Sequence, residues 1–215
     1  EFSNNFVISY FDNIISNDLP YSENLQSYIY SFFIELLVNH KNIILFLKPK
    51  RKNEFNNHLS KFPALIKFIN AKRIKVFYGE SERSKARPAE IALASNLVIG
   101  MGISSAAAEG CFAGSVSFHL NLSKINNDFD KYGLNKVVFR DIDSLKKATI
   151  NQISGQGLSI KECQNYHKIL DPFQDGFAYM RTGAILSEFQ IELNDGSSIE
   201  EAIKITKDKF PELII

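Results

Sequence analysis

Apolar and polar positions are arranged in two alternating ways along this chain. Short continuous apolar runs, such as 43–47 (IILFL), are typical of strands buried on both faces of a parallel sheet. Between them, apolar residues recur every three or four positions, as in 25–37, which predicts amphipathic helices. The runs expected to form strands are 5–10, 43–47, 74–78, 97–99, 115–120 and 136–139.

Expected helices follow these strands in turn. They are 25–37 with Ser22 as its N-cap, 55–70, 88–95, 106–113, 142–150, 160–168, 177–189 and 198–210. Pro63 is expected to bend or break the second of them. The polar segments 79–87 and 121–133 are expected to be loops. The alternation predicts an α/β fold, doubly wound and Rossmann-like, with a mostly parallel sheet of five to six strands and helices on both faces.

Composition narrows the class of protein. The 215 residues, 45% of them hydrophobic, can bury the core of an ordinary globular domain. A net charge of +1 gives no reason to expect a nucleic-acid partner. Cys111, Cys163 and the four histidines show no metal-ligand or disulfide spacing, so we expect no metal site, and two cysteines suggest a reducing, cytoplasmic compartment.

Targeting signals and the start of the sequence bear on where the protein acts and how much of it the chain covers. We expect no signal peptide in it, and it has no apolar run long enough to span a bilayer. The chain begins with Glu1-Phe2, a common cloning remnant, and its only methionines are Met101 and Met180. We therefore expect it to be a piece of a longer protein.

The segment 97–120 holds the first candidate site. An apolar run ends in Gly100-Met101-Gly102, and Ser104 and Ser105 precede the expected helix. Glycines allow close approach of a ligand, and a helix N-terminus offers free N–H groups to a phosphate. The alternative is a turn in which Ser104 only caps the helix. The spacing is neither a dinucleotide fingerprint, which needs a third glycine where Ser105 stands, nor a P-loop.

Other polar residues are expected at the same edge of the sheet. Lys48-Pro49-Lys50 directly follows the strand 43–47, and its lysines could pair with a phosphate, whereas Arg51 and Lys52 fit a solvated surface run. Glu109, one turn beyond Ser105, could accept hydrogen bonds from a ribose, or be an ordinary surface glutamate. His119 ends a strand at this edge, although a structural histidine is the simpler interpretation. No residue pattern identifies a catalytic group.

Two segments resemble a known family. The segment ending ASNLVIGMGISSAAAEGCFAGSVSFHL resembles the donor-binding segment in the C-terminal half of GT-B glycosyltransferases, with Ser104, Ser105, Glu109 and Gly114 on the pattern. The segment LDPFQDGFAYMRTGAIL resembles the LDPFrDGkAseRig segment of bacterial surface-polysaccharide transferases. Its matching residues are Leu170, Asp171, Pro172, Phe173, Asp175, Gly176, Ala178, Arg181 and Gly183, whereas Gln174 and Phe177 depart. The resemblance covers Phe6 to Glu188.

This resemblance implies a function and a set of site residues. The chain would be the donor-binding half of a glycosyltransferase that moves a sugar from a CMP- or UDP-type nucleotide sugar to a surface glycan. Gly100, Gly102, Ser104, Ser105, Glu109, His119, Lys48 and Lys50 would bind the nucleotide, which is a substrate, and no cofactor is expected. Ser104-Ser105 is similar to the Ser-Ser motif of bacterial sialyl- and Kdo-type transferases. Lys48-Pro49-Lys50 takes the place of their His-Pro motif but lacks its histidine.

The resemblance also sets expectations for the rest of the protein. The donor-binding domain would span 1–190, and 191–215 would be a helical extension packed on it. A missing N-terminal domain would bind the glycan acceptor, and the arrangement is compatible with peripheral membrane association of the full-length enzyme. Two alternatives stay open: an enzyme like the nucleotide-sugar 2-epimerases, which share this fold and loop, and a non-catalytic binding or interaction module.

Overall fold

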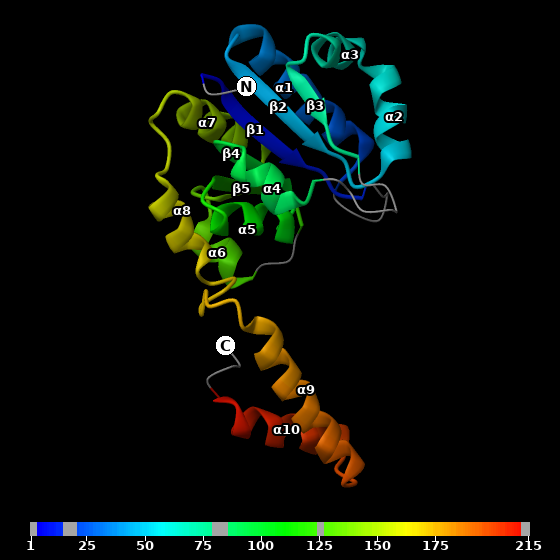
Figure 1. The fold of residues 1–215 in the computed structure, drawn as a ribbon, viewed down its shortest axis with the longest axis vertical. Helices are drawn as coiled ribbons and strands as arrows, with labels where there is room; N and C mark the ends of the chain where they lie inside the picture. Colours follow the sequence, from blue (N-terminus) through cyan, green and yellow to red (C-terminus); the bar gives the residue numbers. More distant parts are fainter. Residues whose placement is uncertain (1–3, 15–20, 79–85, 124–126, 212–215) are drawn as a thin grey trace. The chain divides into compact units, whose positions relative to one another are not determined.

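The computed structural model of the chain describes residues 4–14, 21–78, 86–123 and 127–211. These residues belong to two compact units, divided between Leu170 and Asp171. The first unit is built on a six-stranded sheet in which neighbouring strands all run parallel, in the order β3-β2-β1-β4-β5-β6 (Figure 1). Its strands are β1 (Phe6–Phe11), β2 (Ile43–Lys48), β3 (Ile74–Val76), β4 (Leu97–Met101), β5 (Val116–Leu120) and β6 (Val138–Phe139).

Helices cover both faces of this sheet. Those of the first unit are α1 (Glu23–Asn39), α2 (Lys52–Lys61), α3 (Pro63–Asn70), α4 (Pro88–Leu93), α5 (Ser105–Phe112), α6 (Asp128–Gly133), α7 (Ile142–Ile153) and α8 (Ile160–His167). On one face α1 lies beside α7, where Lys146 sits over the Phe32 ring. On the other face α4 packs on α5, and α5 packs on α8 and β5. The fold class expected from the sequence is confirmed.

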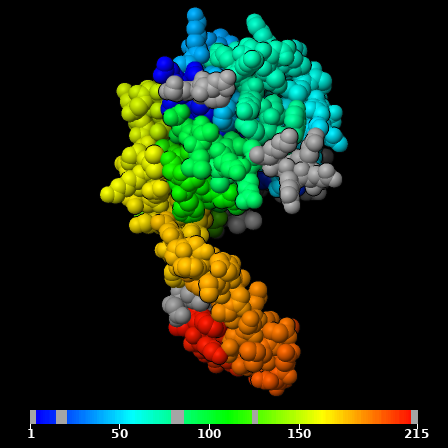
Figure 2. Space-filling model, in the orientation of Figure 1, coloured from blue at the N-terminus to red at the C-terminus, as the bar shows by residue number. Residues whose placement is uncertain are grey.

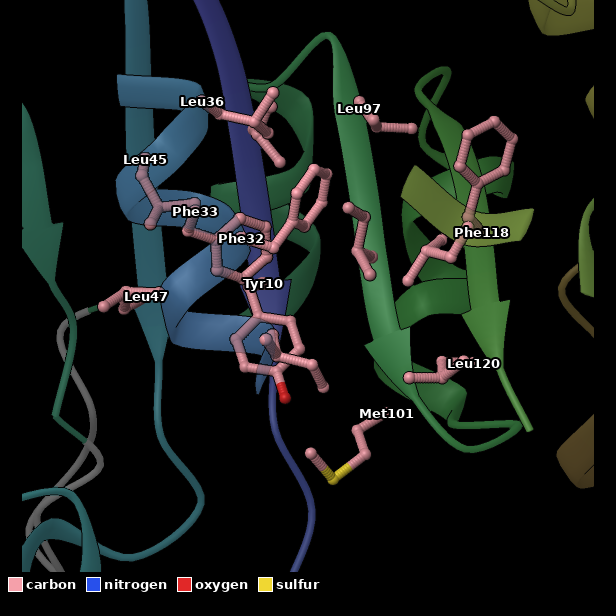
Figure 3. Packing of buried hydrophobic residues seen from close by; sticks show 14 of the residues in the cluster. Tyr10, Phe32, Phe33, Leu36, Leu45, Leu47, Leu97, Met101, Phe118 and Leu120 are labelled. Carbon is pink, nitrogen blue, oxygen red and sulfur yellow. The ribbon is translucent and has the colours of Figure 1, made fainter. Parts of the chain in front are cut away.

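The core lies mainly between α1 and the sheet. Alternate residues of β1, Ile8 and Tyr10, face α1, and the Tyr10 and Phe33 rings meet edge to face with centroids 5.2 Å apart. Figure 3 shows these rings beside aliphatic side chains of β2, β4 and β5. A smaller apolar cluster containing Val7 and Phe11 fills the opposite face, under α4 and α5. Because β1 is buried on both faces, its sequence is apolar except for the buried Ser9.

The strand order creates a switch point at the centre of the sheet. From β1 the chain moves to β2 and β3 on one side, and then returns to β4 on the other side of β1. Residues after β1 and β4 therefore diverge at the carboxyl edge, the position where open α/β sheets leave a crevice for ligands.

Several boundaries differ from the sequence expectation. The helix expected over 55–70 is two helices, because Phe62 precedes Pro63 and takes a non-helical conformation with φ −126° and ψ 73°. The segment expected as a polar loop, 121–133, contains the helix α6, which Asn127 caps through its side chain. Residues 124–126, most of the expected loop 79–87 and the Glu1-Phe2 start lie outside the described residues.

The second unit contains a pair of packed helices. They are α9 (Ala178–Asn194) and α10 (Ile199–Lys209), and Ser198 begins α10 with a capping box to Glu201. Lys209 Nζ lies 2.5 Å from Glu188 Oε1, which joins the two helices. The domain boundary expected at residue 190 falls inside α9, so the extent of a donor-binding domain stays a prediction. In neither unit is a described helix long and apolar enough to cross a membrane.

Candidate functional site

A cleft of about 450 Å³ opens at the switch point of the sheet. Its walls come from the segments that follow β1, β2 and β4 and from the start of α4. Its lining residues are Phe11, Asp12, Asn13, Lys48, Pro49, Lys50, Pro88, Ile103, Ser104, Ser105 and Ala106. The structure therefore brings together the two lysines and the two serines that the sequence placed at this edge.

The wall after β4 is shaped by two glycines. Gly102 has a φ of +77°, and a Cβ there would lie 2.7 Å from the Tyr21 hydroxyl oxygen. A Cβ on Gly100 would lie 2.7 Å from Ser104 Oγ. Only glycine fits at these two points of the turn. Neither residue lines the cleft, so their observed role is to allow the turn that positions Ser104.

The same wall carries the N-terminus of α5. Ser104 is its N-cap, and its Oγ accepts a hydrogen bond of 3.3 Å from the Ala107 N–H. The N–H groups of Ser105 and Ala106 belong to the first turn and have no acceptor within the helix. They line the cleft together with the exposed Ser105 side chain. This arrangement suits an anion, because the donors and the helix dipole act at one point.

The opposite wall is basic. Pro49 is buried and ends β2, so Lys48 and Lys50 stand on either side of a rigid residue. Partial burial lowers the pKa of Lys48. Lys50 is exposed, and its Nζ donates to Asn13 Oδ1 at 3.3 Å. Two cations thus face the N-terminus of α5 across the cleft.

Asp12 is a titratable group in the cleft that sequence reasoning missed. It follows β1 directly, is partly buried, and its Oδ1 accepts a 2.5 Å hydrogen bond from the Lys50 N–H. Burial raises the pKa of Asp12 to about 7, with a smaller contribution from Glu54, while the Lys50 N–H and charge oppose the rise. Its place after a central strand was the available signal, since such positions face the crevice.

Glu109 and His119 do not line the cleft. Glu109 is exposed on α5, one turn beyond the lining residues. His119 is completely buried within β5, where its ring packs 5.2 Å from the Phe129 ring. Its position in the strand directs it with Ser117 toward α5 and α8 and not to the edge of the sheet. Burial, and then the neighbouring His167, lower the pKa of His119 to about 3.

Two cysteines and two histidines meet behind α5. Cys111 Sγ lies 3.3 Å from Cys163 Sγ, although 52 residues separate them in sequence. His167 Nδ1 lies 3.7 Å from Cys163 Sγ, and His167 Nε2 lies 3.0 Å from His119 Nε2. All four residues are completely buried. Sequence spacing gave no sign of this cluster because α5, β5 and α8 each supply part of it.

A polar network lies beyond β5. Asn121 Nδ2 donates to both carboxylate oxygens of the buried Asp130, at 2.8 and 3.0 Å. Arg140 lies 3.2 Å from the same carboxylate, and the Tyr21 hydroxyl donates to Asn121 Oδ1 at 3.4 Å. The network ties α6 and Tyr21 to the end of β5. Because Tyr21 lies beside Gly102, the network also supports the glycine turn.

The part of the LDPFQDGFAYMR segment that lies in the second unit, 171–181, is a self-contained turn followed by the start of α9. Asp175 accepts two hydrogen bonds from the Arg181 guanidinium, at 2.7 and 3.0 Å, and one of 2.9 Å from the Phe177 N–H. Arg181 also stacks 4.0 Å from the Phe173 ring centroid. The Arg181 hydrogen bonds lower the pKa of Asp175 to about 2. The motif thus fixes the start of α9 through its own residues.

Comparison with known proteins supports the fold. No protein-family model matches the chain, and no curated protein matches it. Among solved structures it is similar to a protein from Listeria monocytogenes named as a UDP-N-acetylglucosamine 2-epimerase, with a TM-score of 0.56 and 13% sequence identity. The match covers 92% of this chain and 47% of that protein, so the chain spans about half its length. At this identity the likeness establishes a shared fold.

Proposed function

We propose that this chain is the donor-binding half of a glycosyltransferase that takes a sugar from a nucleotide sugar and delivers it to a glycan. The observation that carries the proposal is the cleft at the switch point. Two lysines on one wall face the N-terminus of α5 and two serines on the other, within about 450 Å³. Sugar transfer from a nucleotide leaves negative charge on the departing phosphate, and such a site stabilises that charge electrostatically.

Each residue has a role in this proposal. Lys48 and Lys50 neutralise the phosphate as point charges, and Ser105 with the first-turn N–H groups of α5 donates hydrogen bonds to it. Glu109, exposed one turn further along α5, would reach the ribose hydroxyls. The acceptor and its general base would be supplied by a further domain. The match to about half of a longer protein is consistent with that division of labour.

The test is a nucleotide panel on this chain. CMP, UMP, UDP, GDP and TDP are compared by thermal shift, and the best ligand is then titrated calorimetrically against variants. Ser105→Ala and Lys50→Ala should each weaken binding about tenfold, the value of one charge-assisted hydrogen bond. Ser187→Ala and Lys67→Ala, both exposed outside the cleft, serve as matched controls and should bind normally.

Two results would refute the assignment. One is that no nucleotide raises the thermal midpoint, which favours a non-catalytic module. The other is that the cleft variants bind as tightly as the controls. The chain should also turn over little donor by itself, so a fast transferase rate from this chain alone would contradict its being half of the active unit.

A sugar-nucleotide epimerase is the second candidate. It is favoured by the fold shared with the Listeria protein and by Asp12, a group in the cleft able to exchange a proton near neutral pH. The two functions separate in one product assay with UDP-N-acetylhexosamine. Formation of the 2-epimer without an acceptor supports the epimerase, whereas acceptor-dependent release of the nucleotide supports the transferase.

A further inference from the structure

The helix α8 is held to the first unit by an unusual pair of residues. Its buried residues are Cys163 and His167, four positions apart and hence on the same face of the helix. A surface helix normally packs through leucine, isoleucine or valine, and α8 buries none. The buried face of α8 is therefore made of two side chains whose common property is that they bind metal ions.

Cys111 completes a set of ligands from the facing helix α5. The three possible ligand atoms, the two sulfurs and a ring nitrogen of His167, lie within 4.8 Å of one another. The sulfurs are 3.3 Å apart, and Cys163 Sγ is 3.7 Å from His167 Nδ1. Around a tetrahedral zinc with Zn–S near 2.3 Å and Zn–N near 2.0 Å, neighbouring ligand atoms are roughly 3.5–3.8 Å apart. The sulfur–sulfur and Cys163–His167 separations are thus within about half an ångström of those in such a site.

The hydrogen bonds of the two histidines support a cation at His167 Nδ1. A chain of contacts runs from the Cys163 carbonyl to His167 Nδ1 (2.9 Å), from His167 Nε2 to His119 Nε2 (3.0 Å), and from His119 Nδ1 to the Gly102 carbonyl (3.4 Å). Both ends of this series are acceptors, so its three contacts need three N–H groups. Two neutral imidazoles have only two. A cation on His167 Nδ1 removes the need for one. His167 Nε2–H then donates to His119, and His119 Nδ1–H donates to Gly102.

We propose that Cys111, Cys163 and His167 form a binding site for a soft d¹⁰ cation, with Zn²⁺ as the expected ion and His119 orienting His167 from behind. Two thiolates and an imidazole select such ions over Mg²⁺ or Ca²⁺. The contact of His119 with the Gly102 carbonyl connects this site to the turn that positions Ser104.

Because the ligand residues are completely buried, the role of the site is structural. α8 packs on α5, and in the space-filling view yellow residues border the green part of the surface (Figure 2). A bound cation would pin α8 to α5, and so hold from behind the helix whose N-terminus faces the cleft. The inference is independent of the proposed function, since it concerns residues outside the cleft.

The chain offers a clean assay because it contains two cysteines, so every thiol signal reports on this site. The full chain, reduced and freed of metal, is titrated with Zn²⁺ while the rate of thiol modification is followed, with Ca²⁺ as the control ion. One equivalent of Zn²⁺ should protect both cysteines and raise the thermal midpoint, and Co²⁺ should give a thiolate-to-cobalt charge-transfer band. Equal modification rates with and without Zn²⁺, and no such band with Co²⁺, would overturn the proposal.

Variants separate a ligand from a packing role. Cys163→Ser should abolish the charge-transfer band, His167→Gln should weaken Zn²⁺ binding at least about tenfold, and His119→Gln should weaken it by a similar factor as an orienting residue. His58→Gln, at a buried histidine packed on Tyr30, is the matched control and should bind Zn²⁺ normally. If a cysteine variant fails to fold, the Zn²⁺ stoichiometry of the unaltered chain still decides the question. A stoichiometry well below one overturns the site.

Discussion

Replacing Asp12 by asparagine tests the electrostatics of the cleft directly. The variant keeps an oxygen that can accept the Lys50 N–H but can no longer ionise. Burial raises the pKa of Asp12 from 3.8 to about 7, so the folded state holds this proton more tightly than the unfolded state. The carboxyl's contribution to stability is therefore fully present below about pH 4, falls as the pH rises, and levels off above about pH 7.

The expected magnitude follows from this pKa difference. A rise of about three units corresponds to at most roughly 4 kcal/mol at 1.36 kcal/mol per unit. Because the carboxyl is only partly buried, screening by solvent reduces this, and we expect about 1–2 kcal/mol. Asp12→Asn should thus be more stable than the unaltered chain by this amount at pH 8, and the gain should shrink at pH 5.

The assay is urea unfolding of both proteins at pH 5 and pH 8, followed by circular dichroism. Asp141→Asn is a control of opposite sign, because hydrogen bonds from Ser144 lower the pKa of Asp141 at the N-cap of α7. It should lose stability by a similar amount at pH 5 and pH 8, because the contribution of a carboxyl with a lowered pKa falls only below its ordinary pKa of 3.8. If Asp12→Asn gained nothing at pH 8, or gained equally at both pH values, the reasoning about Asp12 would be refuted.

Two further substitutions test the supports of the cleft, each by urea unfolding. Gly102→Ala should lower the free energy of unfolding by about 2–3 kcal/mol, because Gly102 has a positive φ and a Cβ there would contact Tyr21. Gly114→Ala is the control. Its φ is +100°, but a Cβ there would have no atom within 4 Å, so it should lower the free energy of unfolding by only about 1 kcal/mol. Equal losses would show that the Tyr21 contact does not matter. Asn121→Ala should lower the free energy of unfolding by about 2 kcal/mol, because it leaves the buried Asp130 with fewer hydrogen-bond donors. The exposed control Asn194→Ala should change it little. An unchanged stability of Asn121→Ala would contradict the role given to this network.

The sequence predicted the parts of this protein that depend on local patterns. The continuous apolar run of β2 and the three-to-four spacing in α1 identify their elements, because burial on two faces or on one face leaves those patterns. Lys50 and Ser105 could be placed at one edge because parallel strands end at the same edge. α6 was missed because it is six residues long and its start depends on the single cap Asn127.

Features that depend on tertiary contacts could not be predicted. The position of Asp12 after a strand could indicate that it lies at the edge of the sheet, but its raised pKa depends on burial and on its hydrogen bond from Lys50, which only the structure shows. His119 was expected at the edge of the sheet. The register of β5 with β4 instead places it beside Gly100 within the strand, and the sequence does not give that register. Cys111 and Cys163 meet only because α8 folds back on α5.

The register of the central strands has a consequence for what the cleft can accept. Phe11 at the end of β1 pairs with Lys48 of β2 on one side and with Gly100 of β4 on the other. The two walls are therefore separated by two inter-strand spacings, close to 10 Å, a distance set by backbone hydrogen bonds that no side chain can adjust. The sheet therefore sets a fixed span between the two walls. Selection among ligands must then come from what projects into that span, so related chains could change their ligand by altering the residues after β1, β2 and β4 while the frame stays the same.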